Sequence, residues 1–235
     1  MRPLLCLFHF AGGNAYSFQF LQPFLADFDV FCPELPGRGK RMAEAVLTDF
    51  PDAVTDVYQQ LMQRLGNRVL ILYGHSLGSA LAFGVAGMLE AAGRPADYLL
   101  VSGNPGPGVR EPTFRYLMNR EDFLQELRQL GGIPDAFFQD KDLIDFFEPI
   151  MRADFELAER NDLAASKPLY TPVYALMGNQ EQGAVHIENW HKFTTARFDH
   201  ELLEGDHFFI HRHPQRLAGI IRLCCSRTKQ INHPC

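Results

Sequence analysis

The sequence predicts an α/β protein with a mostly parallel sheet, helices on both faces and an inserted helical block. Short apolar runs alternate with helix-like segments from Leu4 to about Val101, as in chains whose parallel strands are joined by helices. The alternation stops at about 112–168, where apolar side chains recur every three or four residues. We therefore expect a single domain over residues 1–235 with a helical lid inserted at about 112–168.

Six short apolar segments, each bounded by turn residues, predict the strands of this sheet. With 235 residues, of which 46% are hydrophobic, the chain is long enough to bury one substantial core. The polar end of the chain predicts a disordered tail. The strands are expected near 4–10, 28–33, 69–73, 97–102, 172–177 and 198–203, and the tail at 226–235.

The third predicted strand leads into Gly-His-Ser-Leu-Gly at 74–78, and a helix is expected to follow at 79–92. This is the pattern of a nucleophile elbow, in which the two glycines remove the Cβ atoms that would collide in a tight strand-to-helix turn. The Ser76 hydroxyl would stand exposed at the N-terminus of the helix. There the N–H of Leu77 and the helix dipole could stabilise an oxyanion. The pattern predicts Ser76 as a nucleophile and Leu77 as an oxyanion donor.

A serine nucleophile needs a base, and in folds with this elbow the triad follows the order Ser, acid, His. His207 lies in a tight turn directly after the strand-like run 198–205, so its ring would reach the sheet edge where the serine emerges. His211 and His213 are alternatives, which we interpret as surface residues opening the last helix. A metal site at these histidines is not favoured, because no Cys or carboxylate with ligand spacing accompanies them. We expect no metal and no other cofactor.

The acid of the triad is expected in the loop at 178–183, where Glu181 is the single acidic residue. A carboxylate there would accept the Nδ1 proton of His207 and stabilise the imidazolium. Asp206 and Glu188 remain alternatives. Asp206 adjoins His207 and should point elsewhere, and Glu188 falls inside an expected helix.

A second oxyanion donor is expected where the first predicted strand runs into Ala11-Gly12-Gly13. Two glycines allow backbone N–H groups to approach a substrate oxygen closely, which points to the N–H of Ala11. The alternative is a flexible turn without function. A phosphate-binding loop is less favoured, because neither a Lys-Ser/Thr pair nor a spaced third glycine follows.

Taken in order, these motifs resemble the type II thioesterases that accompany nonribosomal peptide synthetases and polyketide synthases, which are α/β-hydrolases. The resemblance extends from Leu4 to about Leu223 and includes segments similar to the lid of that family. The matching stretches are Phe-Ala-Gly-Gly at 10–13, Pro-Glu-Leu-Pro-Gly-Arg-Gly at 33–39 with Arg41 and Glu44, the elbow at 74–78, the lid-like 123–127, 130–134 and 149–155, and Gly-Asp-His-Phe-Phe at 205–209.

The resemblance implies hydrolysis of acyl thioesters carried on the phosphopantetheine arms of acyl or peptidyl carrier proteins, as a housekeeping step. It places the nucleophile on Ser76, the base on His207 and the oxyanion region on Ala11 and Leu77. Glu181 departs from the Asp that the family usually has in a Gly-x-x-Asp loop. A second departure is His9, where Pro is common.

Three other functions remain open on the same residues. An acyltransferase or a general carboxylesterase would use the same triad, whereas a catalytically silent module would bind carrier proteins without cleaving them. An acidic carrier would need basic side chains on this chain, and the lid and the residues just before it offer several, although solvated surface charges are the alternative interpretation. These candidates are Arg110, Arg115, Arg120 and Arg152.

Composition excludes several other classes of protein. The net charge of -6 and the lack of a basic run with aromatic residues argue against nucleic acid binding. No apolar run approaches the ~20 residues that span a bilayer, and we expect no signal peptide, because the run that opens the sequence is only about seven residues long, so we expect a cytoplasmic protein without a membrane partner. We also expect a monomer. The five cysteines are an odd number and suggest reduced thiols, with Cys6 and Cys32 in the core.

Overall fold

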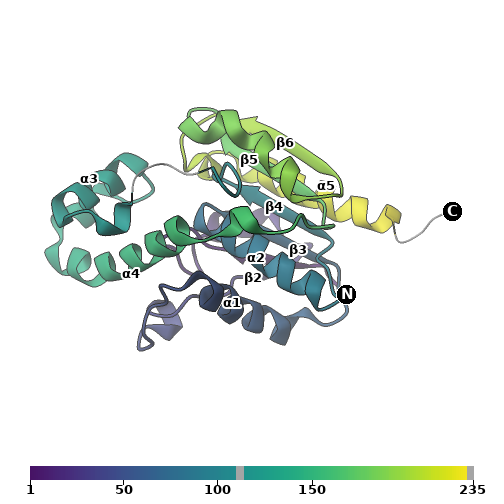
Figure 1. Ribbon diagram of the computed structural model, residues 1–235, viewed down its shortest axis with the longest axis horizontal. Helices are drawn as coiled ribbons and strands as arrows, with labels where there is room; N and C mark the ends of the chain where they lie inside the picture. Colours follow the sequence, from purple (N-terminus) through teal and green to yellow (C-terminus); the bar gives the residue numbers. More distant parts are fainter. Residues whose placement is uncertain (110–113, 232–235) are drawn as a thin grey trace.

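A computed structural model describes residues 1–109 and 114–231 and shows a six-stranded sheet in the order β2-β1-β3-β4-β5-β6 (Figure 1). Every pair of neighbouring strands is parallel, which confirms the predicted α/β class. The strands are β1 (Leu4–Phe8), β2 (Asp29–Phe31), β3 (Leu70–His75), β4 (Tyr98–Ser102), β5 (Val173–Gly178) and β6 (Phe198–Leu203).

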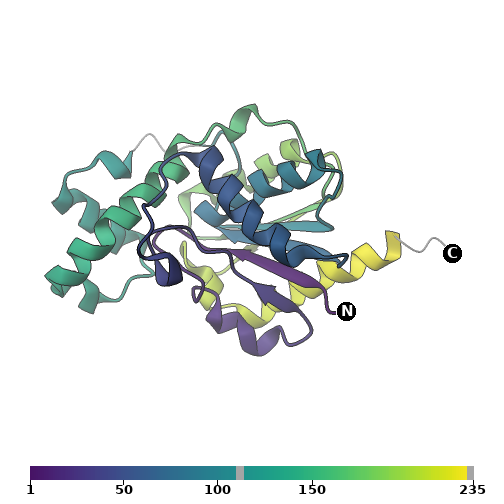
Figure 2. The ribbon, with the colours of Figure 1, turned by 90° about the horizontal axis from the view of Figure 1, so that it is seen from below.

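Helices cover both faces of the sheet, and β1 shows why its sequence is apolar throughout. Leu4, Cys6 and Phe8 point into the core shared with α1 and α2, whereas Leu5 and Leu7 point into the core shared with α5. Figure 2 shows α1 and α5 on opposite sides of the sheet. A strand buried on both faces needs no polar alternation. The helices are α1 (Phe50–Leu65), α2 (Leu77–Ala91), α3 (Arg120–Leu130), α4 (Lys141–Arg160) and α5 (Pro214–Ile231), and the 3-10 segments are η1 (Gln19–Phe24), η2 (Gly39–Arg41), η3 (Arg115–Leu117), η4 (Asp135–Gln139), η5 (Leu163–Ala165), η6 (Gln182–Phe193) and η7 (Phe209–His211).

The segment between β4 and β5, which we call the helical block, contains α3 and α4 and projects from one edge of the sheet (Figure 1). Phe123, Leu127 and Met151 form a small apolar core within it. The second half of α4 is different, because it packs against α1 and α2 and contributes Leu157 to the main core. The expected lid at 112–168 is therefore not one uniform unit, since the second half of α4 packs into the main core of the sheet and its helices.

Two predicted boundaries were wrong for identifiable reasons. The strand β3 continues to His75 and α2 begins at Leu77, so the turn between them is one residue long and the helix starts before residue 79. At the other end of the chain, α5 continues to Ile231, so residues 226–231 are helical rather than a disordered tail. Thr228 is buried there, which extends the contact of this helix with the body; residues 232–235 lie outside the described part.

Candidate active site

Ser76 occupies the single-residue turn between β3 and α2. Its φ of 55° and ψ of -117° make it the one non-glycine residue with positive φ among those the structure describes. A Cβ at Gly74 would overlap the carbonyl oxygen of Gly78, so only glycine allows strand and helix to approach so closely. The Ser76 side chain is partly exposed at the N-terminus of α2, where the first N–H groups have no partner within the helix.

The His207 ring meets Glu181 across the loops that follow β6 and β5. The two atoms, Nδ1 of His207 and Oε2 of Glu181, lie 2.7 Å apart. A carboxylate only accepts, so Nδ1 carries the proton, and in the neutral imidazole Nε2 then has a lone pair. The other Glu181 oxygen accepts from the N–H of Gly178 at 2.7 Å, which fixes the carboxylate in place.

The two alternative acids make other contacts. Glu188 lies 3.8 Å from the His200 ring, and Asp206 accepts from the Phe208 N–H and lies 3.7 Å from Arg212. His213 binds the backbone oxygen of residue 204 through its Nε2. Of the three carboxylates considered from the sequence, Glu181 is thus the one that is hydrogen-bonded to the His207 imidazole.

The ends of the central strands bring these residues to one edge of the sheet. The Ser76 N–H donates to the carbonyl of Ser102 at the end of β4, and the next residue, Gly103, lies between two histidines. A Cβ at Gly103 would stand 2.5 Å from Cε1 of His75 and 3.2 Å from Cε1 of His207. The centroids of those two rings are 5.0 Å apart. The side chain before Ser76 therefore touches the imidazole held by Glu181.

The loop after β1 lies against the start of α2. The Gly13 N–H donates to the Phe10 carbonyl at 2.9 Å, and Gly12 has a φ of 74°, so residues 10–13 form a turn of the type II kind with Ala11 at its second position. A Cβ at Gly78 would overlap the carbonyl oxygen of the β1 residue Phe8. The segments carrying the N–H groups of residues 11 and 77 are thus in direct contact.

Apolar side chains and the helical block close over this edge. The Phe10 ring packs edge-on against Phe208, with centroids 5.1 Å apart. A Cβ at Gly132, in the loop after α3, would lie 2.5 Å from two ring atoms of Phe208. A Cβ at Gly12 would lie 3.1 Å from Cγ of Met151 in α4. The surroundings favour a substrate with an apolar group next to the reacting carbonyl.

A buried polar chain beneath the site was not found by the sequence analysis. Nδ1 of His75 lies 2.8 Å from the Ser102 hydroxyl, which lies 2.9 Å from the Tyr73 hydroxyl. Burial lowers the pKa of His75 well below its ordinary value and raises the pKa of Tyr73, so both groups stay neutral. The sequence offered one indication of this chain, which is that Ser102 ends an otherwise apolar strand at the sheet edge where Ser76 lies.

The arginines considered as docking groups are engaged within the helical block. Arg115 pairs with Glu126 at 3.1 Å and Glu159 at 3.5 Å. Arg120 and Arg152 share Glu148, at 3.3 Å and 2.8 Å, and Arg120 also binds Asp145. Their charges are balanced locally, which disfavours them as an unpaired basic patch for an acidic partner. Arg110 lies outside the described residues.

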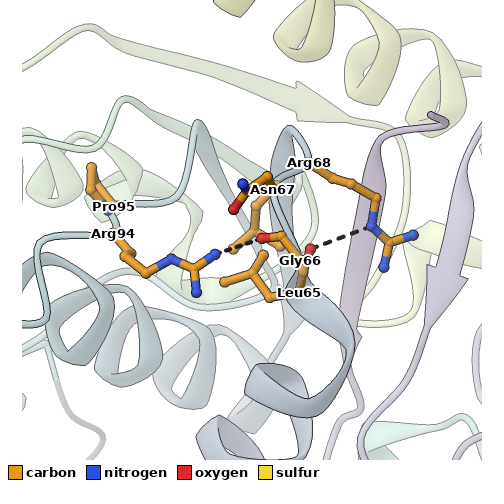
Figure 3. Close-up of a pocket in the computed structure, with 7 residues that line it drawn as sticks. Leu65, Gly66, Asn67, Arg68, Arg94 and Pro95 are labelled. Atoms are coloured by element: carbon orange, nitrogen blue, oxygen red, sulfur yellow. Dashed lines mark hydrogen bonds between the residues drawn. The ribbon is translucent and has the colours of Figure 1, made fainter.

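The described surface away from this edge is also hollowed, but at a place without catalytic side chains. A surface pocket of about 130 Å³ lies where β3 and β4 begin, at the opposite edge of the sheet from Ser76 (Figure 3). The guanidinium of Arg94 donates to the carbonyl of Gly66 there, and that of Arg68 donates to Leu65. Among the described residues, no three Cys, His, Asp or Glu side chains gather as metal ligands. Nor is any described helix both long and apolar enough to cross a bilayer.

Comparison with known proteins identifies the family. A family model for the thioesterase domain matches residues 3–225. Linear gramicidin dehydrogenase LgrE of Brevibacillus parabrevis is 33% identical over 227 residues, covering 93% of this chain and 86% of that protein. Thioesterase PikA5 of Streptomyces venezuelae is 30% identical over 210 residues, covering 88% and 75%.

Solved structures agree with the sequence matches. The type II thioesterase BorB from the borrelidin biosynthetic cluster has a TM-score of 0.87 at 31% identity, covering 95% of this chain and 93% of that one. The name of LgrE states a dehydrogenase, whereas the family model, PikA5 and BorB all state a thioesterase. The resemblance noted in the sequence is confirmed, and the chain belongs to the thioesterase family, as a thioester hydrolase with the α/β-hydrolase fold.

Proposed function

We propose that this thioesterase releases acyl groups from the phosphopantetheine thiols of acyl or peptidyl carrier proteins, with Ser76 as nucleophile, His207 as general base and Glu181 as its acid. The observation that carries the proposal is the placement of a strained serine at the same sheet edge as the hydrogen-bonded His207 and Glu181 pair. The relationship to BorB, from a biosynthetic cluster, supports the class of substrate and partner.

The first half of the reaction transfers the acyl group to the enzyme. Nε2 of His207 takes the proton of the Ser76 hydroxyl as Oγ attacks the thioester carbonyl carbon, and the carbonyl electron pair moves to the oxygen. The N–H groups of Ala11 and Leu77 donate to that oxyanion. When the oxyanion collapses, the C–S bond breaks, and the thiol leaves with the proton held by His207.

The second half returns the enzyme to its starting state. Nε2 of His207 takes a proton from water, whose oxygen attacks the acyl-enzyme carbonyl. Collapse of the second oxyanion breaks the C–O bond to Ser76, Oγ of Ser76 takes the proton back from His207, and the carboxylic acid leaves. The Glu181 carboxylate stabilises the imidazolium that forms in each half. The longer side chain of Glu reaches His207 from a loop where Asp is common in this family.

The decisive experiment incubates the protein with carrier proteins loaded with different acyl groups and follows intact carrier mass. The wild type should convert acyl carrier to free-thiol carrier and free acid. Ser76→Ala should remain folded and lose a factor on the order of 10³ or more in turnover. Ser226→Ala, on the outer face of α5, is the matched control and should keep wild-type turnover. Wild-type turnover by Ser76→Ala would refute the proposal.

The same experiment separates the remaining functions. An acyltransferase would give an ester or amide when an alcohol or amine acceptor is added, in place of the free acid. A general carboxylesterase would hydrolyse small esters and leave carrier thioesters intact. A silent carrier-binding module would not be labelled at Ser76 by a fluorophosphonate probe, whereas an active serine hydrolase would be.

A further inference from the structure

An ion pair between Arg38 and Asp154 is buried beside the proposed oxyanion loop. Two parallel hydrogen bonds join the side chains, Nη1 to Oδ2 at 2.6 Å and Nη2 to Oδ1 at 2.7 Å, and the side chains are 4% and 1% exposed. Arg38 precedes η2, and Asp154 lies in α4. Burying two charges costs desolvation energy that their attraction does not reliably exceed, so stability alone is a weak reason for such a pair.

Both members of the pair also bind the backbone of the turn at residues 10–13. Oδ2 of Asp154 accepts the N–H of Gly12 at 2.7 Å, and Nη1 of Arg38 donates to the Gly13 carbonyl at 3.1 Å. Type I and type II turns differ by a flip of their central peptide, which here joins Ala11 and Gly12. The Gly12 N–H reaches Asp154 in the observed conformation, so the carboxylate holds the central peptide in this orientation.

The turn at residues 10–13 also fixes the direction of the Ala11 N–H. That N–H belongs to the peptide whose carbonyl is Phe10, and this carbonyl accepts from Gly13 inside the turn and contacts Nδ1 of His9 at 2.9 Å. In a planar trans peptide the N–H points opposite to the C=O. A turn held closed by the ion pair therefore also holds the Ala11 N–H in one direction.

We propose that Asp154 and Arg38 are positioning residues that hold the Ala11 N–H where the oxyanion forms, so that hydrolysis requires the second half of α4 to be seated on the turn. This inference rests on the proposed function. It gives a role to two stretches of sequence, 33–39 and 149–155, that lie far apart in the chain and are joined by this pair. The residues act through the turn and do not touch the substrate.

Two variants separate positioning from stability. In Arg38→Met/Asp154→Leu the pair becomes apolar, which leaves no lone buried charge. Gly12 and Gly13 lose both partners, so the free energy of unfolding should fall only by the cost of two backbone groups left without hydrogen bonds. In Asp154→Asn a side-chain oxygen can still accept from Gly12, but Arg38 stays charged without a carboxylate, so the fold is less stable. The double variant should be the more stable and the slower of the two.

The readouts are kcat and KM for a short acyl N-acetylcysteamine thioester, and inhibition by a trifluoromethyl ketone, whose serine adduct places its oxygen in the oxyanion site. We expect kcat to fall about 100-fold in the double variant and about 10-fold in Asp154→Asn, at unchanged KM. Affinity for the ketone should fall in the same proportion. The matched control is Arg41→Met/Asp56→Leu, which removes another two-bond pair that does not contact residues 10–13 and should keep wild-type kcat.

Each outcome of these measurements supports or overturns the positioning role of Arg38 and Asp154. A stable double variant with wild-type kcat, or with a loss no larger than that of the control, would overturn the inference and leave the proposed function intact. If the double variant does not fold, Asp154→Asn alone decides, because its kcat and ketone affinity must fall together at constant KM. A wild type that hydrolyses neither the short nor the carrier-bound thioester would instead overturn the proposed function and this inference with it.

Discussion

His9 should make the stability of this protein fall as the pH drops below 7. The side chain is buried, its Nδ1 contacts the Phe10 carbonyl, and its Nε2 has no hydrogen-bond partner among the described residues. Burial, reinforced by the nearby charge of Arg38, lowers the pKa of His9 from 6.5 to about 4, against the smaller opposing effects of Asp154 and Glu34. The folded protein therefore resists protonation at this position.

The size and sign of the effect follow from the two pKa values. Above pH 6.5 the imidazole is neutral in both states, so the full stability is present. Below pH 6.5 the unfolded chain binds a proton that the folded protein does not, and stability is lost until the pH reaches about 4. The full difference corresponds to about 3 kcal/mol, of which about 2 kcal/mol is lost by pH 5.

Urea unfolding at pH 8 and pH 5 measures this directly, with His9→Gln as the comparison. Glutamine is neutral at both values and its amide can still donate to the Phe10 carbonyl. The wild type should lose about 2 kcal/mol more than His9→Gln between the two pH values. The shifted pKa of His75 is present in both proteins and cancels. An equal loss in both proteins would show that His9 is protonated as readily folded as unfolded and would refute the reasoning.

Two further changes test the assembly of the site. Glu181→Gln keeps the shape but removes the charge that stabilises the imidazolium, so kcat should fall about 10²- to 10⁴-fold. The controls Glu188→Gln and Asp206→Asn should keep a kcat near that of the wild type. If one of these controls loses activity while Glu181→Gln stays active, the acid is misassigned. Gly103→Ala, whose Cβ would press on two imidazole rings, should reduce kcat about tenfold. Gly93→Ala is the matched control for Gly103→Ala, because Gly93 also has a positive φ but has nothing within 4 Å of the added Cβ. The Gly93 variant should therefore share the backbone strain of about 1 kcal/mol and keep full activity.

The sequence was informative where structure depends on neighbours along the chain. The elbow around Ser76 and the placement of Glu181 and His207 after apolar runs could be predicted, because parallel strands deliver the residues that follow them to one edge. The contact between Glu181 and the His207 imidazole needed coordinates, since three carboxylates were eligible.

Long-range pairing was the part that the sequence did not reveal. Arg38 and Asp154 are separated by 116 residues, and nothing local indicates that they share hydrogen bonds with one turn. Apolar periodicity marked the helical block but could not assign the two halves of α4 to different neighbours, because both halves show the same spacing. The helical end of the chain was missed because its exposed face is polar and its buried face includes Thr228.

The division of α4 has a consequence for protein engineering. Pro149 lies within this helix; before it, Leu143 and Phe146 are exposed, and after it Leu157 is buried in the main core. A chimera that imports the helical block of another relative should therefore be joined at Pro149. A junction placed further along would exchange residue 154 and leave Arg38 in place. Where the imported residue does not match Arg38, the turn at residues 10–13 would lose the ion pair that binds its backbone.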